Sequence, residues 1–503
     1  MFSFTQLGSV LVLVLAAFLS SVAHSIWFHP LAKYPGPFLA RATDFLYWYH
    51  WLQGQLPYYA EQAHQRYGPV VRLGPTRISF IEPEVWRDLH GHKTASKTLQ
   101  VVKDPAMYVD SPHLTEHSLL SEANDDKHGR LRKIFSHGFS DRALKAQEHL
   151  IRAHVDKLVS NIHREASQNN EIDVVKYFNC ATFDIIGELS FGESLGLLEN
   201  SELNAWVESI LYGLEDAAFY SLLLEYPLLG RIVNFFLSEK MKEASAKNAK
   251  YSEDRVRKRM EKGNETEKPD FWTLVLSQHE SGVLNFEQMK SNADLFMQAG
   301  SETTATMLSG LMYNLLLNPE KMKKAVEEVR SSFRNEGELT IEGIQRLRYL
   351  DACFNESMRI YPSTPVGPPR VVVTPGVVCG DVLPVGTRAS IAIMAAYHSP
   401  NNFKDPMKFV PERWIESTSE YTEYANDRRA IFQPFSVGPR NCIGKNLALH
   451  EMRLIACKML WHFDFQLCDE NRGNWYEQKC FWALWSKPPL WVRATAKIPS
   501  NVS

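Results

Sequence analysis

One long helix constrains the fold of this chain more than any other feature of the sequence. Asn285 can cap its first turn with Gln288, three residues on, and Asn318-Pro319 can end it, which predicts a helix of about 32 residues. At 1.5 Å per residue such a helix is roughly 48 Å long, enough to cross a large domain. The chain must therefore build a wide body around it.

The middle of this helix is polar where a core-crossing helix should be apolar. Residues 299–304 read Ala-Gly-Ser-Glu-Thr-Thr, with a helix-weakening glycine and four consecutive hydrogen-bonding or charged side chains. One interpretation is a partly exposed helix with a local Ser/Thr kink. The other is a helix opened beside a buried polar reaction, and the helix alone does not decide between them.

The rest of the chain predicts a mainly α-helical protein with a smaller β-sheet region. From about residue 82 to residue 361, apolar side chains recur at three- and four-residue spacing. Strand-like pieces flank this region and form a hairpin before it and a Pro- and Val-rich segment after it: 70–73, 77–81, 371–373, 377–382 and 387–393.

Composition excludes several classes of protein. The chain has 503 residues and a formal net charge of −3, so it is not a basic nucleic-acid binder. Its 45% hydrophobic content argues against disorder. Its seven cysteines are odd in number and form no CxxC pair, which disfavours both a disulfide framework and a structural zinc site.

The amino-terminal segment has the character of a membrane anchor. The first 32 residues contain no Asp, Glu, Lys or Arg, and Leu7–Ile26 supplies about 20 largely apolar residues, roughly the thickness of a bilayer core. A cleaved signal peptide is the alternative, but the positively charged start of such a peptide is missing. We expect a single-pass transmembrane anchor at 1–29. Lys33 and Arg41 behind it would place the body of the chain, 30–503, in the cytosol.

The most informative stretch is residues 434–444, Pro-Phe-Ser-Val-Gly-Pro-Arg-Asn-Cys-Ile-Gly, which precedes an amphipathic helix of about 17 residues. Cys442 thus lies in a glycine-punctuated loop at a helix start, where free N–H groups favour a thiolate. Arg440 and Lys445 act in the same direction. Taken alone, a cysteine before a helix is more often a buried spectator.

The spacing of Phe435, Gly438, Arg440, Cys442 and Gly444 resembles the haem-binding signature of the cytochrome P-450 monooxygenases. The resemblance implies that Cys442 is the axial ligand of haem b iron, in a P-450 fold with a large helical body, a long central helix and a smaller sheet region. Three further segments resemble this family in the right order. Because the paired motifs must meet in one core, we expect one haem-thiolate domain over 30–503.

The first of these segments contains Glu356 and Arg359, a carboxylate and a guanidinium on one helix face. An exposed pair of this kind is worth under about 1 kcal/mol. The resemblance instead implies a buried triad completed by Arg413, which supports the cysteine loop.

The second segment is the polar centre of the long helix. There the resemblance implies that Thr303 hydrogen-bonds dioxygen and that Glu302 relays protons from solvent.

The third segment, residues 128–133, resembles a helix that contacts the haem propionates, although a histidine replaces the family's tryptophan. The resemblance implies four propionate contacts: His128, Arg132, Arg370 and Arg440. A second group of basic residues is either solvated surface or a docking site for an acidic electron donor: Lys127, Arg130, Lys133 and Lys445.

The resemblance also implies a substrate, partners and a location. Substrate contacts would come from apolar residues, which suggests a lipophilic molecule: Phe296, Ala299, Pro365, Val366, Phe481 and Trp482. No dinucleotide or flavin motif is evident, so electrons would come from NADPH through a separate NADPH-cytochrome reductase, with cytochrome b5 as a second donor. The expected location is the endoplasmic reticulum membrane.

The sequence as a whole resembles those of fungal secondary-metabolite oxygenases of the trichothecene and averantin hydroxylase type. It implies hydroxylation, epoxidation or a multi-step oxidation of a terpenoid or polyketide. Two alternatives stay open: a haem-thiolate isomerase or dehydratase that uses no external electrons, and a non-catalytic haem-binding membrane protein.

Overall fold

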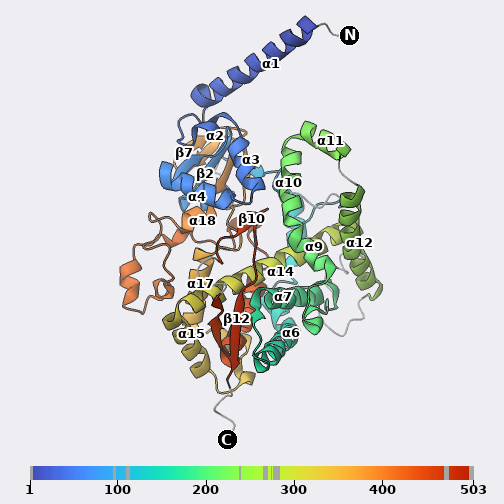
Figure 1. Ribbon diagram of the computed structural model, residues 1–503, viewed down its shortest axis with the longest axis vertical. Coiled ribbons are helices and arrows are strands. Elements are labelled where there is room, and N and C mark those ends of the chain that lie inside the picture. Colours follow the sequence, from blue (N-terminus) through green and yellow to red (C-terminus); the bar gives the residue numbers. More distant parts are fainter. Residues whose placement is uncertain are drawn as a thin grey trace.

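The computed structural model describes residues 4–93, 98–108, 114–236, 239–263, 270–272, 275, 284–469 and 475–497. Most of these residues are helical (Figure 1). The helices are α1 (Phe4–Ala23), α2 (Phe38–Ala42), α3 (Phe45–Leu52), α4 (Leu56–Tyr67), α5 (Asp125–Ser136), α6 (Asp141–Ser167), α7 (Val174–Phe191), α8 (Leu197–Asn200), α9 (Ala205–Tyr212), α10 (Leu214–Glu225), α11 (Pro227–Phe236), α12 (Glu239–Glu261), α14 (Phe286–Leu317), α15 (Pro319–Ser332), α16 (Ile341–Ile344), α17 (Arg348–Ile360), α18 (Ile393–Tyr397) and α19 (Lys445–His462).

The strands form small sheets at the edges of this helical body. One sheet has five strands in the order β1-β2-β8-β5-β3, in which only the β2–β8 pair is parallel. The other sheets are β4-β12-β9, β10-β11 and β6-β7. The strands are β1 (Val70–Arg72), β2 (Arg77–Phe80), β3 (Gln100–Lys103), β4 (Ile172–Asp173), β5 (Arg370–Thr374), β6 (Gly376–Val378), β7 (Asp381–Leu383), β8 (Arg388–Ile391), β9 (Phe463–Leu467), β10 (Lys479–Phe481), β11 (Leu484–Ser486) and β12 (Trp491–Ala496).

The long central helix forms as the sequence predicts. The Asn285 side chain accepts from the Gln288 N–H, the Gln288 side chain reaches back to the Asn285 N–H, and α14 then runs for 32 residues. It packs most extensively against α7. Gly300 permits this approach, because a Cβ at that position would lie 3.0 Å from Ile186 Cδ1.

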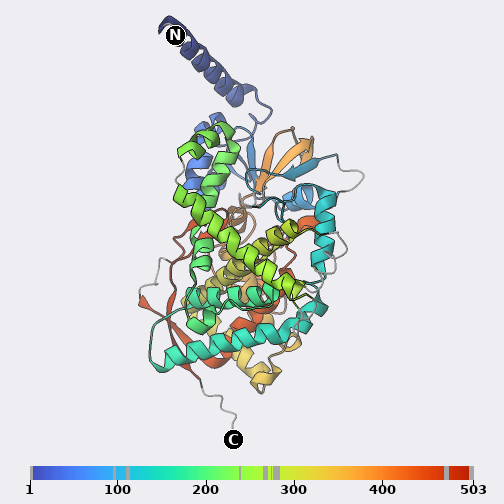
Figure 2. The same ribbon diagram turned by 90° about the vertical axis from the view of Figure 1, so that its right-hand side faces the viewer.

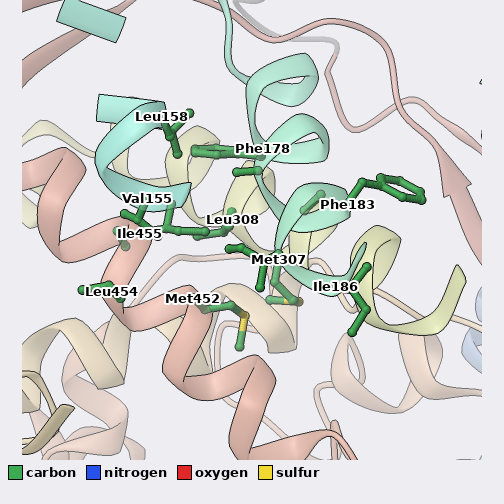
Figure 3. Packing of buried hydrophobic residues seen from close by; sticks show 14 of the residues in the cluster. Val155, Leu158, Phe178, Phe183, Ile186, Met307, Leu308, Met452, Leu454 and Ile455 are labelled. Atoms are coloured by element: carbon green, nitrogen blue, oxygen red, sulfur yellow. The ribbon is translucent and has the colours of Figure 1, made fainter. Parts of the chain in front are cut away.

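The largest core cluster lies where four helices meet. Figure 3 shows apolar side chains of α6, α7, α14 and α19 converging, among them Val155, Phe178, Leu308 and Ile455. Each of these side chains is almost fully buried, so the apolar stripes predicted from the sequence all face this core. The packing fixes α14 relative to α19, and therefore relative to the loop that precedes α19.

One strand prediction is wrong. The segment 377–382 does not run as a single strand, because Cys379 (φ 49°) and Gly380 (φ 84°) turn the chain between β6 and β7. The predicted hairpin of β1 and β2 is confirmed.

The amino-terminal helix α1 projects from the end of the body that carries the five-stranded sheet (Figures 1 and 2). The membrane-crossing anchor expected at 1–29 is not confirmed, since within the described ranges no helix is both long and apolar enough to cross a bilayer. The helix ends at Ala23, and a separate turn follows at His24–Phe28. Ser25 and Ile26 are buried there, and Arg72 donates to the Ser25 carbonyl oxygen over 2.9 Å.

Candidate active site

The loop before α19 presents a thiol. Cys442 is exposed, and its N–H donates to the Phe435 carbonyl oxygen over 2.9 Å. Gly438 fixes the loop, because its φ is +76° and a Cβ there would lie 2.0 Å from the His90 carbonyl oxygen. A positive φ and so close an approach both require glycine at this position.

Although Cys442 is exposed, desolvation by the protein atoms around its thiol raises the pKa of that thiol above its usual value. The Gly444 N–H, Arg132 and Lys445 oppose this effect without reversing it. These three groups act in the direction expected from the sequence, but desolvation outweighs them.

A small cavity lies between α14, α19 and the cysteine loop. Thr303 and Thr304 border it from α14, and Phe435 borders it from the loop. The remaining lining residues come from α14, α17 to α19 and the segments between them: Met307, Met358, Pro362, Ser363, Thr364, Ile393, Tyr397, Pro434, Ala448 and Met452. The cavity thus joins the polar centre of α14 to the loop that carries Cys442.

The hydroxyl groups at the centre of α14 bond back to their own helix. Ser301, Thr303 and Thr304 donate to the carbonyl oxygens four residues earlier, over 2.7, 2.7 and 2.9 Å. Thr303 therefore satisfies its hydrogen locally while its oxygen can still accept a proton from a group in the cavity. The structure shows that the polar centre of this helix borders a cavity whose lining is mostly apolar.

Glu302 does not lie where a relay open to solvent would place it. Its side chain is 3% exposed and forms an ion pair with Lys487, which follows β11. Burial raises the pKa of the Glu302 carboxyl, and Lys487 opposes this shift. Glu302 is not among the described residues that line the cavity.

Cations gather near the start of α5. Burial and the charges of Arg440, Lys103 and Arg132 lower the pKa of the buried His128 to about 3. Lys103 also lies directly opposite Arg370 across the β3–β5 ladder, and two like charges in that position repel each other. So many cations around one site suit a ligand that carries carboxylates.

Two of these cations also hold the cysteine loop. Arg132 donates to the Asn441 carbonyl oxygen and to Asn441 Oδ1, over 2.7 and 2.6 Å. Arg440 pairs with Asp125 at 2.7 Å and donates to the Glu122 carbonyl oxygen over 2.6 Å. The two residues that precede Cys442 are therefore tied to α5 and to the segment just before it.

The structure brings Glu356, Arg359 and Arg413 together, and all three side chains are fully buried. Arg359 Nη2, Arg413 Nε and the Val410 N–H donate to Glu356 Oε1 over 2.9, 3.0 and 3.0 Å. Trp414 Nε1 donates to Glu356 Oε2 over 3.0 Å. Burial works to raise the pKa of Glu356, but the two guanidinium groups lower it overall.

This buried cluster connects to the cysteine loop. Arg359 Nη1 donates to the Tyr397 carbonyl oxygen over 3.0 Å, and the Tyr397 hydroxyl accepts from the Gln433 N–H over 3.0 Å. The Trp414 ring contacts the Phe432 ring at 4.8 Å between centroids. Both connections reach the chain just before Phe435, so the cluster supports the loop from behind.

The expected substrate residues lie outside the described lining of this cavity. Phe296 packs among Phe135, Phe139 and Phe271, with ring centroids 5.1 to 6.3 Å away. The others divide between core and exposed positions. Pro365 and Phe481 are buried, Val366 and Trp482 are half-buried, and Ala299 is exposed. Residues 362–364 border the cavity instead, just before the expected Pro365 and Val366.

Sequence reasoning missed Lys487 and Lys103. Lys487 is a lone cation between a short strand and two prolines, and nothing in its local pattern indicates a partner 185 residues away. Lys103 ends the short strand β3, and nothing in the sequence Gln-Val-Val-Lys singles it out.

Comparisons with known proteins agree with this geometry. The cytochrome P450 family model matches residues 39–490. The chain is 45% identical over 479 residues to the cytochrome P450 monooxygenase FUM2 of Gibberella moniliformis, covering 94% of this chain and 99% of that protein. It is 39% identical to the cytochrome P450 monooxygenase AMT3 of Alternaria alternata, covering 93% and 95%. It is 37% identical to the versicolorin B desaturase stcL of Emericella nidulans, covering 97% of each.

Proposed function

This chain belongs to the cytochrome P450 family, and from that premise we propose that it is a haem-thiolate monooxygenase of a fungal secondary-metabolite pathway. It inserts one oxygen atom from O₂ into a lipophilic small molecule. The observation that carries the proposal is the cavity bordered by Thr303 on one side and by the Cys442 loop on the other. Hydroxylation, epoxidation and multi-step oxidation are all compatible with it, and one relative is named a desaturase.

The residues present suit a haem. Cys442 offers a thiol, and Lys103, Arg132, Arg370, Arg440 and His128 would hold its two carboxylates. When bound, a haem with a thiolate ligand supplies the iron that activates O₂ and favours O–O cleavage. Cys442 would hold the iron as a thiolate, so uptake of the group would be favoured at higher pH.

The side chains of α14 hold and move protons. Splitting O₂ with two electrons consumes two protons, and a hydroxyl beside a carboxylate can deliver them in order. Thr303 Oγ borders the cavity and can pass a proton into it. Glu302, the residue before Thr303, is the nearest carboxylate in sequence to replace that proton.

Electrons would come from NADPH through a separate NADPH-cytochrome reductase, with cytochrome b5 as a second donor. Four basic residues near the cysteine loop support a docking surface for an acidic protein, because all are exposed: Lys127, Arg130, Lys133 and Lys445. The docked protein would face the Cys442 side of the site.

Association with the endoplasmic reticulum membrane, with the catalytic body in the cytosol, also stays a proposal. What supports it is an exposed apolar surface at the α1 end of the molecule. Side chains of α1 such as Leu13 are exposed there, together with Trp27, Phe28 and Phe38. Apolar residues of α11, among them Leu228 and Ile232, are exposed as well.

The direct test of the reaction is isotopic. The purified holoenzyme, a reductase and NADPH are incubated under ¹⁸O₂ with extracts of candidate lipophilic metabolites. A hydroxylated or epoxidised product should contain one ¹⁸O atom, and its formation should stop without NADPH. Product formation that continues without NADPH and reductase would indicate an isomerase or dehydratase and refute the proposal.

A further inference from the structure

A cluster of four phenylalanine rings reaches the cysteine loop: Phe135, Phe139, Phe271 and Phe296. They come from α5, from the turn between α5 and α6, from the segment 270–272 and from α14. The centroids of neighbouring rings lie 4.4 to 6.3 Å apart, and each side chain is 7% exposed or less. Phe296, which the sequence suggested as a substrate contact, is thus part of a buried hydrocarbon cluster.

Phe139 is the member of the cluster that lies beside the thiol. A Cβ added at Gly444 would lie 3.8 Å from Phe139 Cε1 and 4.0 Å from Cys442 Sγ. Apart from the adjoining loop backbone, no other atom of the described residues lies within 4 Å of that position. The ring and the sulfur therefore border the same small space, and Gly444 leaves that space open between them.

The turn between α5 and α6 fixes the position of Phe139. On one side of it, the Gly138 N–H donates to the Phe135 carbonyl oxygen over 3.0 Å. On the other side, the Ser140 hydroxyl donates to the His137 carbonyl oxygen over 2.8 Å. Hydrogen bonds thus hold the chain on both sides of Phe139, and ring contacts hold its side chain.

The sulfur has different surroundings on its other sides. The Gly444 N–H, Arg132 and Lys445 are the polar groups that act on it. Ferric iron, the porphyrin dianion and a thiolate sum to zero charge, and reduction by one electron leaves a negative charge. Because an apolar environment disfavours a charged site, hydrocarbon beside the sulfur lowers the reduction potential of such a centre.

We propose that Phe139 is a positioning residue that acts through Cys442. When haem is bound, the Phe139 ring keeps water away from the sulfur on the Gly444 side, and the Phe271 and Phe296 rings hold it there. The thiolate accepts no hydrogen bond from water on that side, so its electron density is retained for the iron. This inference rests on the proposed haem-thiolate monooxygenase function.

The first test compares two variants of Phe139 in the substrate-free holoenzyme. Phe139→Gln places a polar group beside the sulfur, and a dye-coupled redox titration should show a shift of the reduction potential to more positive values. Phe139→Leu keeps the site apolar and should retain nearly the wild-type potential. Phe333→Gln is the control, because Phe333 is buried to the same degree as Phe139 but packs against Trp461. It should lower thermal stability and leave the potential unchanged.

A second variant and a second measurement keep the test independent of folding. Phe139→Tyr adds one hydroxyl to an otherwise unchanged ring, so it should fold where Phe139→Gln does not. In resonance Raman spectra of the ferric holoenzyme, the iron–sulfur stretching frequency should fall in Phe139→Tyr and Phe139→Gln, because a hydrogen bond to the sulfur weakens its bond to iron. It should stay at the wild-type value in Phe139→Leu.

Two results would overturn the inference. One is a wild-type potential and iron–sulfur frequency in both polar variants of Phe139. The other is a shift of equal size in Phe139→Leu or Phe333→Gln, which would show that the polarity at Phe139 is not its cause. Failure of the proposed function is distinguishable, since it would be seen as a wild-type holoprotein that makes no NADPH-dependent product. The potential and the vibrational spectrum of that holoprotein would still test the role of Phe139.

Discussion

The chemistry of the site depends on single residues whose neighbours decide what they can do. Cys442 is an exposed thiol whose pKa is raised by desolvation and lowered by the Gly444 N–H, Arg132 and Lys445. Thr303 is a hydroxyl at the edge of a cavity, and Glu302 is a carboxyl drawn away from that cavity by Lys487. The residue types were readable from the sequence, but the partners that set their protonation come from distant segments.

Thr303→Ala should separate binding from coupling. The variant lacks the Thr303 hydroxyl but leaves the Cys442 loop unchanged, so haem binding and the thiolate-type spectrum should remain. The amount of product formed per NADPH consumed should fall by roughly 10-fold. Thr303→Ser keeps a hydroxyl and should retain most of the coupling. Full coupling in Thr303→Ala would contradict the role given to this hydroxyl.

Gly438→Ala should prevent the cysteine loop from forming its present turn. A Cβ would lie 2.0 Å from the His90 carbonyl oxygen in addition to the cost of a positive φ. Gly196→Ala is the matched control, because its φ is +72° but no heavy atom lies within 4 Å of the added Cβ. We expect a cost of about 1–2 kcal/mol for the control and loss of haem per protein only for Gly438→Ala. Equal haem content in both would show that the close approach does not matter.

At the scale of helices and strands, short sequence motifs predicted those features that residues close together in the chain determine. The capping residues Asn285 and Gln288 predicted where α14 begins. The strand prediction for 377–382 was wrong, because its three valines favour a strand while Cys379 and Gly380 adopt left-handed backbone conformations that end it. The pairing of Lys487 with Glu302 had no local signal, since only the packing of the β10–β11 segment near α14 brings them together.

The buried cluster that ties α17 to the turn at Pro411–Trp414 should dominate the acid stability of this region. Glu356→Gln removes a carboxylate that faces two buried guanidinium groups and should lower the free energy of unfolding by about 3–5 kcal/mol at neutral pH. Glu327→Gln is the control, an exposed carboxylate 4.0 Å from Lys323. It should change stability by under about 1 kcal/mol.

The sign of the pH dependence follows from the lowered pKa of Glu356. Because its folded pKa lies below its unfolded value of about 4.3, its stabilisation is present above that pH. It is lost as the pH falls through the folded pKa. Urea unfolding of both proteins at a series of pH values should show the difference between wild type and Glu356→Gln shrinking below about pH 4.3. A difference that grows on acidification would contradict the ionised state of this carboxyl.

The molecule as a whole consists of a helical body, which contains the candidate active site, and an end near α1 at which apolar side chains are exposed. The turn after α1 is bound to the body, because Arg72 and Arg41 donate to the Ser25 and Ile26 carbonyl oxygens over 2.9 Å each. The turn that follows α1 is therefore fixed to the body by Arg72 of β1 and Arg41 of α2. A family match over residues 39–490 covers the body but not this helix.

Deleting residues 1–23 should weaken membrane association while sparing the site. The deletion removes α1 and keeps Ser25, whose contacts with Arg72 hold the next turn. In flotation with phosphatidylcholine vesicles the full chain should rise with the lipid, and the shortened chain should rise markedly less, with an unchanged haem spectrum. Equal flotation of the two would show that α1 does not contribute.

The measurement that tests the central claim most directly is the absorption spectrum of the reduced, carbon-monoxide-bound protein. Wild type should show the red-shifted Soret band of a haem with a thiolate ligand, and so should Cys379→Ala, which alters another partly exposed cysteine. Cys442→Ala should lose that band. A wild-type protein without the thiolate-type band, or a Cys442→Ala variant that keeps it, would contradict the account.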